Sequence, residues 1–147
     1  MKQPIWGIDL GGTKIEGVVL AERESTKVLA RKRIPTEADQ GYDHIINRID
    51  ELIQLLKMET QLVPKAIGIG TPGSIDPLTE TMKNSNTTCL NGRTLKQDLV
   101  EQLGIPIFMA NDANCFAMAE ANLGVVKEAL PNASVVFGVI MGTGTGG

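Results

Sequence analysis

The stretch that decides the fold is IWGIDLGGTKIEGVVL, residues 5–20. Two apolar runs, residues 5–10 and 15–20, flank the turn formed by Gly11, Gly12, Thr13 and Lys14. Apolar runs of this length on either side of a glycine-rich turn predict a β-hairpin. Because strands and helices alternate after this hairpin, the sequence predicts a mixed α/β sheet with helices on both faces.

The alternation after the hairpin follows from apolar periods and from the positions of glycine and proline. Residues 28–34 and 65–70 predict two strands, and a helical apolar period predicts a helix over residues 42–62. Residues 71–92 are rich in Thr, Asn, Pro, Gly and Ser and lack an apolar period, which predicts a long functional loop. The remaining predicted elements are a helix at 94–103, a strand at 105–110, a helix at about 111–123 and a strand at 135–141.

The composition excludes several classes of protein. The 147 residues are 42% hydrophobic and 21% charged, which is typical of one globular domain and not of a disordered chain. With 14 Lys and Arg against 17 Asp and Glu, the net charge is −3, and aromatic residues make up 3%, so nothing indicates nucleic-acid binding. The two cysteines lack CxxC spacing, which predicts reduced thiols in the cytoplasm and no zinc site. The uncharged stretch at residues 129–147 contains five glycines, and this predicts a buried strand and no membrane span.

Asp9 and the glycine turn that follows it form the first candidate site. Glycine lets backbone N–H groups approach an anion closely, and two glycines in a row permit positive φ. Thr13 and Lys14 add a hydroxyl and an ammonium group for phosphate oxygens. Asp9 ends a strand, where its carboxylate could hold Mg²⁺ directly or through water. By itself, however, a two-glycine turn is also typical of a plain hairpin.

Three further motifs each allow a structural and a functional interpretation. Residues 68–74, GIGTPGS, lead from a strand into the polar loop, where glycine is most often a simple turn residue. Asn111 and Asp112 stand at the start of a helix, where Asp is usually an N-cap. A helix N-terminus also favours the carboxylate form, which suits a proton acceptor. Residues 142–147 form another glycine turn after a strand and are a second candidate phosphate loop.

Together and in this order, the motifs resemble the ROK family of sugar kinases and related repressors. The resemblance rests on GIDLGGTK (7–14), GIGTPGSIDP (68–77), ANDANC (110–115) and VIMGTGTGG (139–147). The segment KNSNTTCLNG, residues 83–92, looks most like the bacterial fructokinase branch of that family. The resemblance implies a ribonuclease-H-like, actin-like ATPase fold, with residues 1–147 as the N-terminal lobe of a two-lobe protein.

The resemblance also implies a role for each matched position. Asp112 is expected to be the catalytic base, Asn111 to hydrogen-bond sugar hydroxyls and Asp9 to lie near the magnesium ion. The residues expected at the nucleotide phosphates are Asp9, Gly11, Gly12, Thr13, Lys14, Gly142, Thr143 and Gly144. The residues expected at the sugar are Gly73, Ser74, Asn84, Asn86, Asn111 and Asp112.

The implied activity is ATP-dependent, Mg²⁺-dependent phosphorylation of a hexose by a cytoplasmic homodimer that has neither nucleic-acid nor membrane partners. Residues 83–92 favour fructose, with glucose, mannose and N-acetylhexosamines as alternatives. A sugar-responsive regulator without its DNA-binding segment is a second class, and an actin-like ATPase without a small acceptor is a third. The family's zinc motif, further sugar ligands and second domain lie beyond the last glycine turn. The chain alone is therefore expected to fold but to be inactive.

Overall fold

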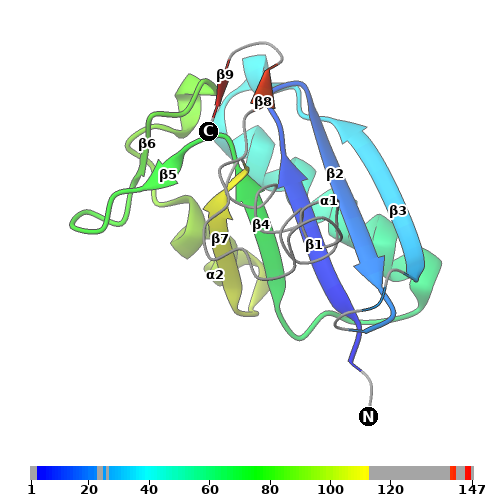
Figure 1. Ribbon diagram of the computed structural model, residues 1–147. Coiled ribbons are helices and arrows are strands. Elements are labelled where there is room, and N and C mark those ends of the chain that lie inside the picture. The colour runs from blue at the N-terminus through cyan, green and yellow to red at the C-terminus, as the bar shows by residue number, and fades with distance from the viewer. Residues whose placement is uncertain (1–2, 23–24, 26, 113–139, 142–144, 147) are drawn as a thin grey trace, which may run out of the picture.

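The computed structural model describes residues 3–22, 25, 27–112, 140–141 and 145–146. Its main sheet has five strands in the order β3-β2-β1-β4-β7 (Figure 1). The strands are β1 (Ile5–Leu10), β2 (Lys14–Leu20), β3 (Val28–Pro35), β4 (Ile67–Thr71) and β7 (Ile107–Asn111). β1, β2 and β3 pair antiparallel, whereas β4 runs parallel to β1 and to β7. The predicted mixed α/β class is therefore confirmed.

The N-terminal hairpin forms where the sequence predicted it, because apolar side chains alternate along both strands. Those that face the core are Trp6, Ile8, Leu10, Ile15 and Val19. Gly17 stands in the same row, opposite Ile8, and a Cβ there would lie 2.7 Å from Leu56 Cδ1 of helix α1 (Tyr42–Thr60). The missing side chain at Gly17 therefore lets α1 pack directly on the hairpin.

Both described helices, α1 and α2 (Leu95–Leu103), share one hydrophobic core with the sheet and lie behind it in Figure 1. The apolar period predicted for α1 is confirmed by its buried residues, which are Tyr42, Ile45, Ile46, Ile49, Leu52, Ile53 and Leu56. α1 ends at Gln61 in a left-handed conformation with φ 57°, before Pro64 is reached. α2 ends at Gly104 with φ 68°, as predicted. The helix predicted at about 111–123 lies outside the described residues, apart from its start.

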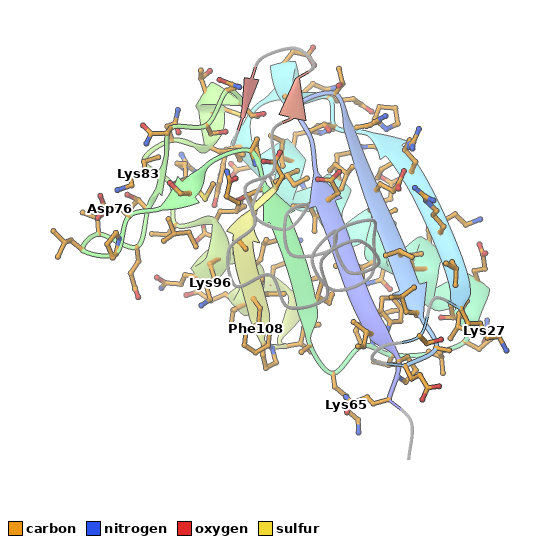
Figure 2. The ribbon with its side chains drawn as sticks, viewed as in Figure 1. Lys27, Lys65, Asp76, Lys83, Lys96 and Phe108 are labelled. Atoms are coloured by element: carbon orange, nitrogen blue, oxygen red, sulfur yellow. The ribbon has the colours of Figure 1, made fainter. Side chains whose placement is uncertain are left out.

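The segment predicted as one long loop, residues 71–92, contains regular structure. β5 (Ser74–Ile75) and β6 (Met82–Lys83) form a hairpin, and a 3₁₀ helix, η2 (Thr88–Leu90), follows it. The hairpin projects beyond β7, and across it Lys83 Nζ lies 3.2 Å from Asp76 Oδ2 (Figure 2). Met82 and Leu90 are buried in the core. The sequence predicted no strand or helix within this segment, and that was wrong, because single buried side chains hold the segment without a repeating apolar pattern.

The remaining described elements are short. A 3₁₀ helix, η1 (Ala38–Gln40), leads from β3 into α1. Near the C-terminus, β8 (Ile140–Met141) pairs antiparallel with β9 (Thr145–Gly146). The predicted strand at 135–141 is thus described only at its end. Within the described part of the chain, no helix combines the length and the apolar character that crossing a membrane requires.

Candidate active site

Three parallel strands bring the predicted site residues to one edge of the sheet. In the register of the sheet, Asp9 of β1 lies beside Gly70 of β4, and Thr71 of β4 lies beside Asn111 of β7. The carboxyl ends of parallel strands lie together, and open α/β sheets bind ligands outside this edge. Asp9, Asn111 and the adjacent Asp112 are therefore neighbours although they are far apart in the sequence.

The segment from Gly11 to Lys14 forms the tight turn between β1 and β2. The Gly11 N–H donates to the Lys14 carbonyl oxygen at 3.0 Å. A Cβ on Gly11 would lie 2.6 Å from the same oxygen, so only glycine fits there. Neither Gly11 nor Gly12 has a positive φ, so the turn does not use the left-handed backbone that two glycines permit. The lack of a Cβ at Gly11 instead makes room for the Lys14 carbonyl oxygen. Thr13 and Lys14 are exposed beside the two glycines.

The glycine turn is held in place by Thr36, a residue that the sequence did not indicate. Thr36 follows β3 and is fully buried. Its Oγ1 donates to the Gly11 carbonyl oxygen at 2.7 Å, and its backbone N–H donates to the Thr13 carbonyl oxygen at 2.9 Å. Gly11 and Thr36 are 25 positions apart, so no local pattern predicts this contact. The two hydrogen bonds fix the turn against the end of β3.

Gly73 joins the β5–β6 hairpin to the strand ends. A Cβ on Gly73 would lie 2.6 Å from the Lys83 carbonyl oxygen and 3.1 Å from Ser85, so this packing requires glycine. The Gly73 carbonyl oxygen accepts hydrogen bonds from Thr71 Oγ1 and Asn111 Nδ2, each at 3.1 Å. Two predicted sugar-binding residues, Gly73 and Asn111, are therefore in direct contact, and the contact orients the Asn111 amide.

The other predicted sugar-binding residues belong to the same projecting segment. Ser74 begins β5, and Asn84 and Asn86 are exposed after β6. Asn84 has φ 58°, a left-handed conformation that asparagine tolerates better than most residues. Asn91, which the sequence did not indicate, accepts the Ser85 N–H through Oδ1 at 2.9 Å and donates through Nδ2 to the Ser85 carbonyl oxygen at 3.0 Å. This pair of bonds fixes the backbone between Asn84 and Asn86.

Asp9 lies among other negative charges. Partial desolvation of the carboxylate raises the pKa of Asp9, although the residue is exposed at the sheet edge, and the carboxylates of Asp112 and Glu16 raise it further. Lys14 acts in the opposite direction. Glu16 faces Asp9 across the hairpin; burial alone would raise the pKa of Glu16, but hydrogen bonds from two arginines of β3 lower it. The Asp112 carboxylate is thus near enough to raise the pKa of Asp9, and a cation at this edge would offset that repulsion.

The donor set at this edge fits a magnesium ion that shares its shell with a substrate. Mg²⁺ usually takes one or two protein carboxylates and completes its coordination with water and phosphate oxygens, which suits Asp9. Within the described residues, no group of three or more His, Cys, Asp or Glu side chains could hold a metal ion. Of the helix predicted to start at Asn111, only Asp112 is described. The second predicted phosphate loop, formed by Gly142, Thr143 and Gly144, lies outside the described residues.

Known proteins share both the sequence and the fold of this chain. A family model described as "ROK family" matches residues 5–147. An N-acetyl-D-glucosamine kinase of Aliivibrio salmonicida (strain LFI1238) is 38% identical over 142 residues, which are 97% of this chain and 44% of that protein. A crystal structure of a ROK hexokinase from Thermus thermophilus has a TM-score of 0.70 at 30% identity and covers 85% of this chain and 39% of its own. A ROK family glucokinase from Streptomyces griseus, in complex with glucose and AMPPNP, has a TM-score of 0.72 at 25% identity and covers 84% and 38%.

These similarities confirm the predicted fold and the family-level resemblance. They do not support the expected fructokinase branch specifically, because relatives between 36% and 38% identical are named N-acetyl-D-glucosamine kinases. The chain spans 44% of the length of these curated relatives.

Proposed function

This chain belongs to the ROK family, and from that premise we propose that it forms the N-terminal lobe of an ATP-dependent hexose kinase. The observation that carries the proposal is the meeting of three segments at one sheet edge: the turn at Gly11, the bend at Gly73 and the pair Asn111 and Asp112. Phosphoryl transfer depends mainly on positioning and charge stabilisation, because its transition state is loose. A glycine turn beside carboxylates and an oriented amide fits that requirement.

Each group has a distinct task in the proposed reaction. Backbone N–H groups of the glycine turn, together with Lys14, bind phosphate oxygens of ATP. Asn111, whose amide is oriented by Gly73, hydrogen-bonds a hydroxyl of the sugar. Asp112 accepts the proton of the hydroxyl that attacks phosphorus. Mg²⁺, which Asp9 would hold, supplies positive charge that balances the phosphate groups when it is bound.

Residues outside the described part would complete the site. Gly142, Thr143 and Gly144 remain the proposed second phosphate loop, and the closing wall of the cleft would come from a second lobe. A homodimeric, cytoplasmic protein is part of the same proposal. We expect the 147-residue chain alone to fold without turning over sugar, because transfer requires both substrates in near-attack geometry and loses about 10²-fold for a misplacement of about 1 Å.

N-acetylglucosamine is the proposed acceptor, since the curated relatives at 36% to 38% identity carry that sugar in their names. Fructose is the second candidate, and the resemblance of residues 83–92 favours it. However, two positions of that segment have backbone roles. Asn91 holds Ser85 through two hydrogen bonds, and Gly92 adopts φ 78°. Asn91 and Gly92 therefore give little information about which sugar is bound. For this reason the choice of acceptor follows the names of the curated relatives.

The test is a coupled ADP-release assay on the full-length protein with ATP, Mg²⁺ and a panel of sugars. The panel contains N-acetylglucosamine, N-acetylmannosamine, glucose, mannose and fructose. We expect the highest kcat/KM for N-acetylglucosamine, and a higher value for fructose would select the second candidate. Absence of hexose-dependent turnover would contradict the kinase proposal and favour the sugar-responsive regulator.

A further inference from the structure

One threonine beside the glycine turn is largely buried, yet its hydroxyl makes no hydrogen bond within the part of the chain that the structure describes. The described residues contain four buried polar side chains: Thr36, Thr71, Ser85 and Thr87. The hydroxyls of Thr36 and Thr71 donate to the carbonyl oxygens of Gly11 and Gly73, respectively. The Ser85 hydroxyl oxygen accepts a hydrogen bond from the Thr87 N–H. Thr87, at 8% exposure, is the exception: within the part of the chain that the structure describes, its Oγ1 makes no hydrogen bond and does not cap η2. Polar groups of largely buried residues are usually paired within the protein, so the accessible Thr87 hydroxyl is free to pair with something else.

The backbone of Thr87 is held on both sides. Its N–H donates to Ser85 Oγ at 3.1 Å, and its carbonyl oxygen accepts the Leu90 N–H at 3.0 Å. These bonds leave the side chain pointing toward the glycine turn, where Oγ1 lies 3.3 Å from the position that a Cβ on Gly12 would occupy. Any side chain at Gly12 would therefore press on this hydroxyl.

The Thr87 hydroxyl also remains open to a ligand. Every side-chain nitrogen or oxygen of the described residues that is fully enclosed has a hydrogen-bond partner. Because Thr87 Oγ1 has none, it is not fully enclosed, and it lies close to Gly12 of the turn. A hydroxyl on a largely buried side chain that is still accessible is well suited to an anionic oxygen, since hydrogen bonds to charged groups are stronger at low exposure.

We infer that Thr87 is a further phosphate-binding residue, whose Oγ1–H donates to an oxygen of the phosphoryl group that the glycine turn binds. The inference rests on the proposed function, because it takes the ligand of the turn to be a nucleotide phosphate. The position favours phosphate over sugar: Thr87 meets Gly12 of the turn, whereas the predicted sugar-binding contact joins Asn111 to Gly73. Thr87 directly follows Asn86, a predicted sugar-binding residue, so this part of the chain would contact both the sugar and the nucleotide.

The test replaces Thr87 by valine in the full-length protein. Valine keeps the branched shape and the backbone bonds and removes only the hydroxyl. We expect kcat/KM for ATP to fall about 10- to 100-fold, the usual effect of losing a hydrogen bond to a charged group. Binding of Mg²⁺–AMPPNP, measured by calorimetry, should weaken by a similar factor while the affinity for the sugar is unchanged. Thr87→Ser should restore both values, and Thr88→Val, at the exposed neighbouring threonine, is the matched control.

Two results would overturn the inference: Thr87→Val binding AMPPNP as tightly as the wild type, or Thr87→Val losing affinity for the sugar instead of the nucleotide. If the valine variant does not fold, Thr87→Ala removes the same hydroxyl without adding volume and is judged by the same measurements. Failure of the kinase proposal is recognised separately, as absence of turnover in the wild type with every hexose. AMPPNP binding by the wild type and by Thr87→Val still decides the role of Thr87 in that case.

Discussion

Replacing Gly11 by alanine should destabilise the protein far more than the same change at Gly12. A Cβ on Gly11 would lie 2.6 Å from the Lys14 carbonyl oxygen, 3.4 − 2.6 = 0.8 Å inside the start of ordinary contact. The obstacle is backbone, and it accepts the hydrogen bond of Gly11 itself, so relief of the clash stretches that bond. Overpacking costs about 1–3 kcal/mol and a lost hydrogen bond about 1 kcal/mol, so we expect a loss of about 2–4 kcal/mol for Gly11→Ala.

Gly12→Ala is the matched control, because among the described residues its Cβ would meet only the Thr87 hydroxyl, at 3.3 Å, where a shift of a few tenths of an ångström relieves the contact. Alanine restricts the unfolded chain, and because neither glycine has a positive φ this offsets about 0.4–1 kcal/mol at both positions, which leaves a net loss of about 1–3.5 kcal/mol for Gly11→Ala. We expect the free energy of unfolding of Gly12→Ala to change by less than about 1 kcal/mol. Urea unfolding followed by circular dichroism measures both variants. Equal losses at the two positions, or no loss at Gly11, would refute the packing argument.

Three further predictions concern the residues around the turn. Asp112→Asn should lower kcat by about 10²–10⁴-fold with little change in the KM for ATP or for the sugar, because it removes the proposed base. An unchanged kcat in steady-state assays would show that Asp112 is only an N-cap. Thr36→Val deletes the donor to the Gly11 carbonyl oxygen and should lower the free energy of urea unfolding by about 1–3 kcal/mol. It should also raise the KM for ATP, and Thr36→Ser should restore both values. A valine variant that matches the wild type would show that the turn does not depend on this hydrogen bond. The fold raises the pKa of Asp9, so its charge destabilises the protein above that raised pKa, and the penalty disappears below the ordinary value of 3.8. Asp9→Asn should therefore raise Tm at pH 7 and lose this gain as the pH falls toward 3.8. A gain that does not vary with pH in thermal melts would contradict the raised pKa of Asp9, which desolvation and the charges of Asp112 and Glu16 produce.

The elements that the sequence predicted well are those whose apolar residues repeat at a local period. The hairpin of β1 and β2 alternates with period two, and α1 follows a helical period, so neighbouring residues carry the information. The candidate site was predictable to the same extent. Asp9, the glycine turn and Asn111 with Asp112 lie at the ends of predicted strands, where short motifs mark the change from strand to turn or helix.

Three features could be found only from the three-dimensional structure. They are the hydrogen bond from Thr36 to the turn, the two hydrogen bonds between Asn91 and Ser85, and the proximity of Thr87 to Gly12. The order β3-β2-β1-β4-β7 places β3 beside the hairpin and β4 between β1 and β7, which sets the positions of the segments that follow these strands. Thr36 and Thr87 carry no apolar period and make their contacts far along the chain. The sequence by itself therefore determined which residues form the hairpin, the first helix and the strand-end motifs, because these depend on neighbours. The packing of distant strands decided that the Thr36 hydroxyl holds the turn and that the Thr87 hydroxyl lies beside it without a hydrogen bond among the described residues.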